Sequence, residues 1–167
     1  MTYSEEGYQV HDGTGTELEV QQLLRALVRV LRPRLVVETG CYHGRTTLEL
    51  GCAASLVGPD CRVVSCDIDP LHVHEARMRC AGWPVEIREC RGIDLPEIRD
   101  ADLIFSDSVY EARPLEVGLA KPGALVVVHD TKVCLIEGHD LAGMVASHGG
   151  LLFDTYRGFG MLRKGAA

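Results

Sequence analysis

The sequence predicts one α/β domain built on a doubly wound, mostly parallel sheet, and three observations lead to this prediction. The chain has 167 residues, a length that suits a single domain with one core. Short apolar runs alternate with amphipathic stretches, which is typical of repeated βα units. The runs are continuously apolar, as expected for strands that helices cover on both faces. Strands are therefore expected at residues 35–37, 62–66, 85–87, 103–105 and 125–128.

Helices are predicted before and between these strands. Leucine and valine residues recur at three- and four-residue steps from Glu17 to Leu31, which indicates an amphipathic helix that Thr16 caps and Pro33 ends. Further helices are expected near residues 44–57, 70–81, 109–120 and 139–148, with a short helical stub around 94–99.

Neither end of the chain follows this alternation of strands and helices. Near the C-terminus, the runs LLFDTY and GFGMLRK are separated by Arg157 and Gly158, a pattern that predicts a β-hairpin. Residues 1–16 contain several glycines and lack periodicity, so we expect a flexible or ligand-ordered N-terminal arm. The domain itself is expected to span residues 17–167.

The composition narrows the classes of function. Aromatic residues make up 5% of the chain and the formal net charge is −7, which argues against a surface that binds nucleic acid. No run of about 18 apolar residues occurs, so no membrane span is expected, and the acidic N-terminus is unlike a signal peptide. The seven cysteines form no CxxC pair or zinc-spaced cluster. They are expected to be reduced, mostly buried residues of a cytoplasmic protein.

Acidic residues are expected at the carboxyl end of every predicted strand. In an open α/β sheet, this edge is where ligands bind. The residues that follow the strands are, in chain order, Glu38, Asp67 with Asp69, Asp94, Asp107, and His129 with Asp130. A lone acid is commonly a turn or cap residue, but acids at all five strand ends indicate a binding site.

The first two strand ends indicate the kind of ligand. Gly40 and Gly44 are four apart, unlike the GxGxxG spacing of a dinucleotide site. The carboxylate of Glu38 repels a phosphate but suits an ammonium or sulfonium group. Asp67 is placed to accept hydrogen bonds from both hydroxyls of a ribose, and Ile68 to offer an apolar surface to an adenine ring. The ligand so described has a ribose, an adenine and a positive group, and no phosphate.

These stretches resemble a known family. VVETGCYHGRTT resembles motif I of the class I S-adenosylmethionine-dependent methyltransferases, and VVSCDIDP resembles their motif II. DLIFSDSVYEARPLEVGLAKPGALVVVHDT is similar to the fourth and fifth strands of small-molecule O-methyltransferases of the catechol, caffeoyl-CoA and macrocin type. The resemblance covers residues 17–163 and implies a Rossmann-like, seven-stranded sheet whose last strand is antiparallel.

The resemblance implies a site for S-adenosylmethionine. The residues expected to contact it are Glu38, Gly40, Cys41, Tyr42, Gly44, Asp67, Ile68, Gly92, Asp94 and Asp107. Glu38 would border the methionine part, and Asp67 would bind the ribose. Where the family often has Gly-Asp-Ala after the third strand, this chain has RGID, so Gly92 and Asp94 either contact the adenine or cap the helical stub.

The resemblance also implies a place for a divalent cation such as Mg²⁺. In metal-dependent members, acids after the fourth and fifth strands hold the ion, and Asp107 and Asp130 match these positions. The ion would lower the pKa of a substrate hydroxyl and aim its oxygen at the methyl group. Thr131 stands where catechol-type enzymes have Asn, so metal-assisted and metal-free transfer both stay open.

The candidate catalytic residues are Asp107, Tyr110 and His129. His129 is interpreted as a metal ligand, a general base or a packed strand-end residue. Tyr110 is interpreted as a proton relay, a pocket wall or the start of a helix. The sequence leaves these alternatives open.

The predicted function is the transfer of a methyl group from S-adenosylmethionine to a hydroxyl of a small molecule, for example a natural product. A non-catalytic member of the same fold, which binds the cofactor or acts as a scaffold, is the main alternative because the chain is short. A nicotinamide-dependent reductase is a remote alternative, since TGCYHGRT lacks the third glycine of TGxxxGxG and no Tyr-xxx-Lys pair occurs. A homodimer, in which a partner chain completes the pocket, is one arrangement that the sequence allows.

Overall fold

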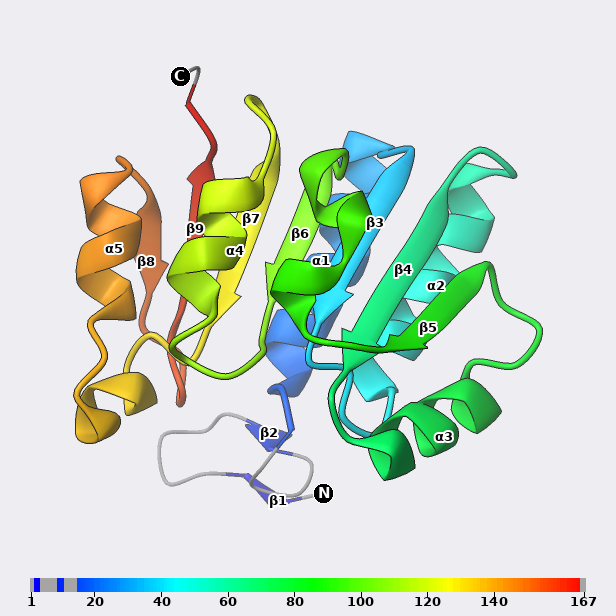
Figure 1. Cartoon of the computed structure of the whole chain (residues 1–167), viewed down its shortest axis with the longest axis horizontal. Helices are drawn as coiled ribbons and strands as arrows, with labels where there is room; N and C mark the ends of the chain where they lie inside the picture. Colours follow the sequence, from blue (N-terminus) through cyan, green and yellow to red (C-terminus); the bar gives the residue numbers. More distant parts are fainter. Residues whose placement is uncertain (1, 4–8, 11–14, 166–167) are drawn as a thin grey trace.

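A seven-stranded sheet forms the centre of the molecule (Figure 1). The structure is a computed structural model that describes residues 2–3, 9–10 and 15–165. The order of the strands is β5-β4-β3-β6-β7-β9-β8. Their bounds are β3 Leu35–Thr39, β4 Arg62–Asp67, β5 Val85–Glu89, β6 Leu103–Ser106, β7 Leu125–His129, β8 Leu151–Phe153 and β9 Phe159–Arg163.

The pairing of the strands confirms the predicted fold class. β3 pairs in parallel with β4 and β6, β4 pairs with β5, and β6 pairs with β7. β9 lies between β7 and β8 and runs antiparallel to both, so the expected hairpin closes the sheet. The chain passes from β7 to the edge strand β8, and the hairpin then brings β9 back between them, so β9 runs antiparallel to β7.

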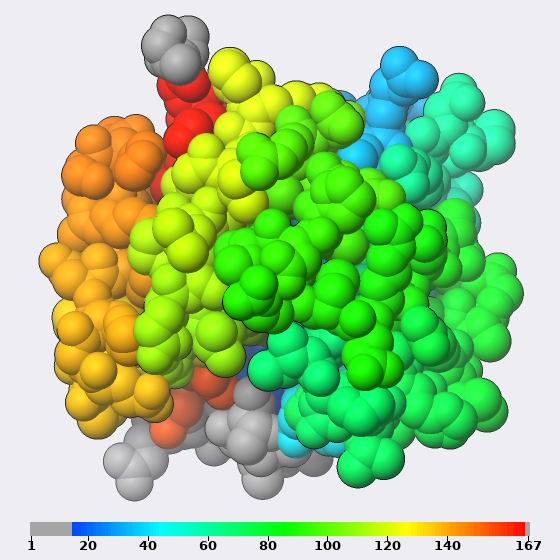
Figure 2. Space-filling view, in the orientation of Figure 1, coloured from blue at the N-terminus to red at the C-terminus, as the bar shows by residue number. Residues whose placement is uncertain are grey.

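Helices cover both faces of the sheet. α1 (Leu18–Leu31) and α2 (Arg45–Val57) pack on one face, while α4 (Arg113–Leu119) and α5 (Leu141–Ser147) pack on the other. α3 (Pro70–Arg79) packs against β4, β5 and α2. In the space-filling view of the α4 and α5 side (Figure 2), these helices and the neighbouring turns hide most of the strands. This coverage explains why the central strands are apolar on both faces.

Two predicted helices differ from the structure. α4 begins at Arg113 rather than near residue 109, because Pro114 favours the first turn of a helix and residues 109–112 form a turn. The stub becomes two 3₁₀ turns, η1 (Gly92–Asp94) and η2 (Pro96–Arg99). A third 3₁₀ turn, η3 (Val133–Glu137), was not predicted.

The start of α1 also corrects the sequence prediction. Thr16 does not cap the helix: Glu17 is the N-cap residue, and its side chain makes no capping hydrogen bond. The hydroxyl of Thr16 instead donates to Oδ2 of Asp107 at 3.1 Å, and the carboxylate of Glu17 points toward β7. Both polar groups therefore contact residues at the ends of β6 and β7 instead of the helix terminus.

The N-terminal segment contains a two-stranded antiparallel pair of β1 (Thr2–Tyr3) and β2 (Gln9–Val10). Of the rest of the predicted arm, residues 1, 4–8 and 11–14 lie outside the described residues, whereas Gly15 and Thr16 are described and precede α1. Within the described part of the chain, no helix is long and apolar enough to cross a membrane.

Candidate active site

A cavity of about 940 Å³ lies at the carboxyl ends of the strands. The order of the strands reverses between β3 and β6, and open α/β sheets bind ligands at such a switch point. The walls come from the start of α1 and from the segments that follow β3, β4, β5, β6 and β7. The volume is in the range of small-molecule sites, roughly 300–1,000 Å³.

The glycines after β3 are required by close packing of the chain. A Cβ on Gly40 would lie 2.4 Å from the backbone oxygen of Asp107, and the φ of Gly40 is +81°. A Cβ on Gly44 would lie 2.7 Å from Cα of Ala76 in α3, at a φ of +77°. Glycine fits both positions because it lacks a Cβ and tolerates positive φ. Gly40 lines the cavity, whereas Gly44 is not among the residues that line it.

Asp67, at the end of β4, holds the loop after β3 in place. Its Oδ2 accepts a hydrogen bond from the backbone N of Tyr42 at 2.9 Å. Its Oδ1 accepts from the backbone N of Asp69 at 3.0 Å and lies 3.3 Å from Nδ1 of His72. A carboxylate has about four lone-pair sites, so Asp67 keeps some acceptor capacity at the cavity wall.

Seven of the ten expected cofactor residues line this cavity, namely Gly40, Cys41, Tyr42, Asp67, Ile68, Gly92 and Asp107. Ile68 is 59% exposed and presents an apolar side chain. Asp94 lies elsewhere: its exposed carboxylate pairs with Arg91 at 2.7 and 3.0 Å. Two further lining residues, Cys66 and Cys90, were not singled out in the sequence because isolated cysteines carry no recognisable spacing.

Glu38 is buried beneath the cavity rather than exposed in it. Its side chain is 0% exposed, and its Oε2 accepts hydrogen bonds from Thr47 at 2.5 Å and Ser65 at 2.6 Å. Among the described residues, none donates to Oε1. Burial raises the pKa of Glu38 to about 7, and the charges of Asp107 and Asp67 add to this, against the two hydroxyl hydrogen bonds. This carboxyl therefore titrates near neutral pH.

The stability of the protein is expected to depend on this titration. Because the pKa of Glu38 rises from 4.5 to about 7 on folding, the unfolded chain ionises first and stability falls as the pH rises between these values. Each unit of pKa shift corresponds to about 1.4 kcal/mol. The free energy of unfolding of Glu38→Gln, relative to that of the wild type, should therefore increase by about 2–3 kcal/mol as the pH rises from 5 to 8. Urea unfolding at each pH measures the difference.

The matched control for this prediction is Glu89→Gln at the exposed end of β5. It removes one negative charge that remains in solvent, so its profile corrects for the general effect of charge. A Glu38→Gln profile parallel to that of the control would contradict the titration of Glu38.

A second buried carboxylate supports the loop after β5. Oε2 of Glu116 accepts hydrogen bonds from Thr39 at 2.8 Å and Ser106 at 2.6 Å. Its Oε1 accepts from Ser108 at 2.6 Å. A Cβ on Gly92 would lie 2.2 Å from Oε1 of Glu116. Glycine at position 92 therefore allows the loop to approach the carboxylate that ties β3 to β6.

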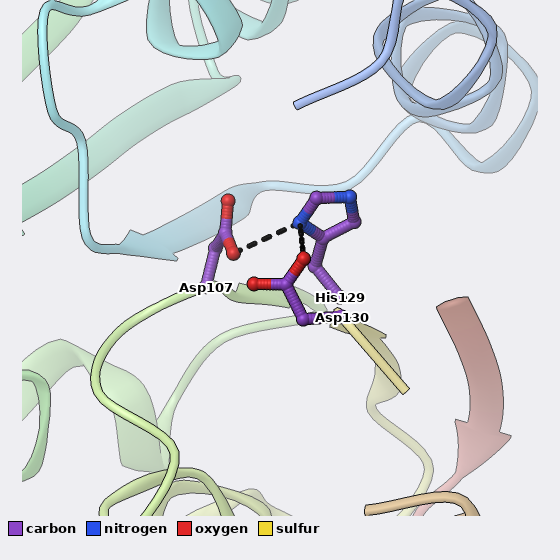
Figure 3. Close-up of side chains that lie close together, drawn as sticks. All are labelled: Asp107, His129 and Asp130. Carbon is purple, nitrogen blue, oxygen red and sulfur yellow. Dashed lines mark hydrogen bonds and ion pairs between the residues drawn. The ribbon is translucent and has the colours of Figure 1, made fainter. Parts of the chain in front are cut away.

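Three of the expected site residues meet at the ends of β6 and β7 (Figure 3). His129 is 1% exposed, and its Nδ1 lies 3.0 Å from Oδ1 of Asp107 and 3.2 Å from Oδ1 of Asp130. Asp130 has a φ of +61°, a left-handed conformation that aspartate tolerates better than most residues. Asp107 and Asp130 line the cavity, whereas His129 lies behind them, outside the described lining.

The other ring nitrogen of His129 contacts Glu17. Nε2 lies 2.5 Å from Oε2 of Glu17, whose Oε1 accepts hydrogen bonds from the backbone N of Arg157 at 2.7 Å and from Thr155 at 3.1 Å. Burial by itself lowers the pKa of His129, but Asp107, Glu17 and Asp130 outweigh it and raise the pKa to about 10. His129 is therefore a buried imidazolium.

Two arginines complete the arrangement. Nη2 of Arg113 lies 3.2 Å from Oδ1 of Asp107 and 3.3 Å from Oδ2 of Asp130. Arg157 binds Asp130 with two nitrogens, Nε to Oδ1 at 2.5 Å and Nη2 to Oδ2 at 3.0 Å. Burial raises the pKa of Asp130, but His129 and the two arginines outweigh it and lower the pKa. The ion-pair cluster consists of Glu17, Asp107, Arg113, His129, Asp130 and Arg157.

Three members of the ion-pair cluster, Glu17, Arg113 and Arg157, were not predicted from the sequence, although the sequence carries a signal for two of them. Glu17 is in phase with the buried stripe of α1, and Arg113 begins the buried stripe of α4. A charged residue on a buried stripe needs a charged partner. Arg157, in the hairpin turn, has no such periodicity and could not have been found this way.

Tyr110 forms part of the cavity wall beside the ion-pair cluster. The guanidinium carbon of Arg113 lies 4.7 Å from the centre of its ring, a cation–π distance. Burial raises the pKa of Tyr110, and the charge of Asp130 adds to the effect. The phenol therefore stays protonated at neutral pH.

No family model matches the sequence, and no curated protein does. Solved structures do match. The O-methyltransferase TomG from Streptomyces achromogenes, solved in complex with SAM, is 24% identical with a TM-score of 0.71, over 90% of this chain and 82% of TomG. SAH-bound PaMTH1 from Podospora anserina is 15% identical with a TM-score of 0.73, over 93% and 81%. An O-methyltransferase from Bacillus cereus, in complex with SAH, is 20% identical with a TM-score of 0.68, over 88% and 81%.

The chain has the methyltransferase fold. Within this fold, the cavity lies at the switch point of the sheet. Seven of the ten expected cofactor residues line it, as do Asp107 and Tyr110 of the three expected catalytic residues.

Three side chains at the ends of β6 and β7 could in principle act as ligands of a divalent ion. Asp107, His129 and Asp130 each offer one ligand atom, and these atoms lie within 4.8 Å of one another. Carboxylate oxygens suit Mg²⁺. However, Arg113 already bridges the two carboxylates, and Arg157 holds both oxygens of Asp130. In this methyltransferase fold, the residues as arranged do not fit an added divalent ion.

Proposed function

We propose that the protein transfers a methyl group from S-adenosylmethionine to a hydroxyl of a small molecule. The observation that carries the proposal is one cavity, at the switch point of a methyltransferase fold, with Asp67 on one part of its wall and Asp107 on another. TomG and the Bacillus cereus protein, which share this fold, are O-methyltransferases.

The cofactor end of the cavity fits S-adenosylmethionine by its chemistry. Asp67 would accept hydrogen bonds from the ribose, and the exposed Ile68 would contact the adenine. The backbone from Gly40 to Tyr42 would border the methionine part. Glu38 lies buried beneath this part of the wall, where it accepts hydrogen bonds from Thr47 and Ser65, and it would not contact the cofactor directly. The cofactor supplies an electrophilic methyl group.

The acceptor end is formed by Asp107, Tyr110 and the start of α1. Oδ2 of Asp107 accepts a hydrogen bond from Thr16, whereas Oδ1 faces His129 and Arg113. Asp107 would orient the acceptor hydroxyl and accept its proton. His129 acts as a positioning residue because it lies behind Asp107 and Asp130, which separate it from the cavity. Tyr110 would form part of the wall that contacts the acceptor.

Several properties of the protein in the cell are part of this proposal. A cytoplasmic location agrees with seven free cysteines, five of which are buried. The net charge of −7 disfavours nucleic acid as a partner. A homodimer, in which the partner chain completes the acceptor end, is tested by light scattering with and without cofactor.

Binding of S-adenosylhomocysteine is expected to depend on Asp67. Asp67→Ala removes an acceptor for a ribose and the support of Tyr42, and should weaken binding about ten- to a hundredfold, as expected for a charged hydrogen bond. Asp67→Asn, which keeps one acceptor oxygen, should lose less. Isothermal titration measures the affinities, with the exposed Asp60→Ala as the control.

The wild-type titration tests the proposal itself. A folded wild type that binds neither S-adenosylmethionine nor S-adenosylhomocysteine would exclude this function, and micromolar binding of NADH would favour a reductase. Cofactor binding without methyl transfer to any of a panel of phenols and sugars would favour the non-catalytic alternative.

A further inference from the structure

We infer that Arg113 is the resident cation of the ion-pair cluster and takes the place between Asp107 and Asp130 that a divalent metal ion would occupy. One of its nitrogens, Nη2, lies within 3.3 Å of both carboxylates. A single positive group that bridges two carboxylates does what a bridging metal ion does: it neutralises them and fixes their separation.

Arg113 is fixed in this position by contacts other than the carboxylates. Its Nε donates to the backbone oxygen of Ser108 at 2.7 Å, and its Nη1 donates to the backbone oxygen of His129 at 2.5 Å. The side chain is 3% exposed and its guanidinium lies over Tyr110. A metal ion would therefore have to displace a buried guanidinium whose remaining donors would lose their partners.

The charges of the ion-pair cluster leave little attraction for a further cation. Two guanidiniums face three carboxylates, and His129 lies among the carboxylates with both ring nitrogens engaged. Asp130 has no oxygen without a cationic neighbour. Arginine stays protonated at every pH at which the protein is folded, so the bridging group cannot be removed by a change of pH.

The bridging guanidinium leaves no place for a Lewis acid beside the acceptor hydroxyl, an inference about the reaction that rests on the proposed function. Without a Lewis acid, the acceptor hydroxyl is activated by the carboxylate of Asp107, whose Oδ2 faces Thr16 at the cavity. Methyl transfer should therefore be unchanged by EDTA and by added Mg²⁺.

Direct metal binding tests the inference without any need for turnover. The wild type, titrated with Mn²⁺ and followed by electron paramagnetic resonance, should show no site tighter than about 1 mM, the weak limit of protein Ca²⁺ sites. Arg113→Ala should gain such a site, because two buried carboxylates lose their bridge. Its Tm should rise by about 5–10 °C in 10 mM MnCl₂, and potassium chloride of equal ionic strength should not reproduce this.

The control is Arg88→Ala. Arg88 also bridges two carboxylates, Glu97 at 2.8 and 2.7 Å and the exposed Glu86 at 2.7 Å, but away from the cavity. It should gain no Mn²⁺ site. A wild-type site tighter than about 1 mM would overturn the inference, as would a folded Arg113→Ala protein that gains no Mn²⁺ affinity. If Arg113→Ala does not fold even with Mn²⁺, the wild-type titration decides.

The two proposals fail separately. Loss of activity in EDTA with recovery in Mg²⁺ would overturn the inference about Arg113 and leave methyl transfer intact. A wild type that binds neither cofactor nor Mn²⁺ would overturn the proposed function and support the inference.

Discussion

Asp130→Asn is expected to lower the free energy of unfolding by about 3–5 kcal/mol, because it leaves the buried guanidinium of Arg113 and the partly buried one of Arg157 short of negative charge. Asp130 is 2% exposed and pairs with Arg113, His129 and Arg157. For a chain of this size, the loss corresponds to a fall in Tm of roughly 10–15 °C. Asparagine keeps the shape and the tolerance of a positive φ, so the change isolates the charge.

Thermal unfolding followed by circular dichroism measures this effect, and Asp94→Asn is the control. Asp94 also pairs with an arginine, Arg91, but both side chains are exposed to solvent. Its removal should leave Tm unchanged, since surface ion pairs contribute little. Equal losses in the two variants would show that the ion-pair cluster is not the stabilising feature.

Gly40→Ala is expected to destabilise the protein and to abolish binding of the cofactor. The left-handed φ of +81° costs an alanine about 1–2 kcal/mol. The new Cβ would lie 2.4 Å from the backbone oxygen of Asp107, and such overpacking costs a further ~1–3 kcal/mol. The chain must therefore move apart at the β3–β6 switch point, between the cofactor and acceptor ends of the cavity.

We expect the affinity for S-adenosylhomocysteine to fall more than about a hundredfold in this variant, or roughly 3 kcal/mol. Gly118→Ala in α4 is the matched control, because its Cβ would have no neighbour within 4 Å. It should be neutral or stabilising by up to about 1 kcal/mol, since alanine favours a helix over glycine. If Gly40→Ala binds the cofactor as the wild type does, the close approach to Asp107 has no role in the site.

Much of the architecture follows from local patterns in the sequence. Continuously apolar runs such as Val126–Val128 predicted buried parallel strands, and the break at Arg157 and Gly158 predicted the hairpin. The topology then brings Asp67, Asp107 and Asp130 to one edge, because the carboxyl ends of parallel strands meet there. Element boundaries were less accurate, as the late start of α4 at Arg113 shows.

The partners of each acid were decided by the tertiary structure. Nothing local in the sequence tells that Glu17 reaches His129 across 112 positions, or that Arg157 returns to Asp130 from the hairpin. Nor does it tell that Glu38 is buried while Asp67 lines the cavity. The sequence determines which strand ends carry acids, because the apolar runs locate the strands and the acids directly follow them in the chain. Which cation neutralises each acid depends on distances between segments far apart in the chain, and these exist only once the sheet has formed.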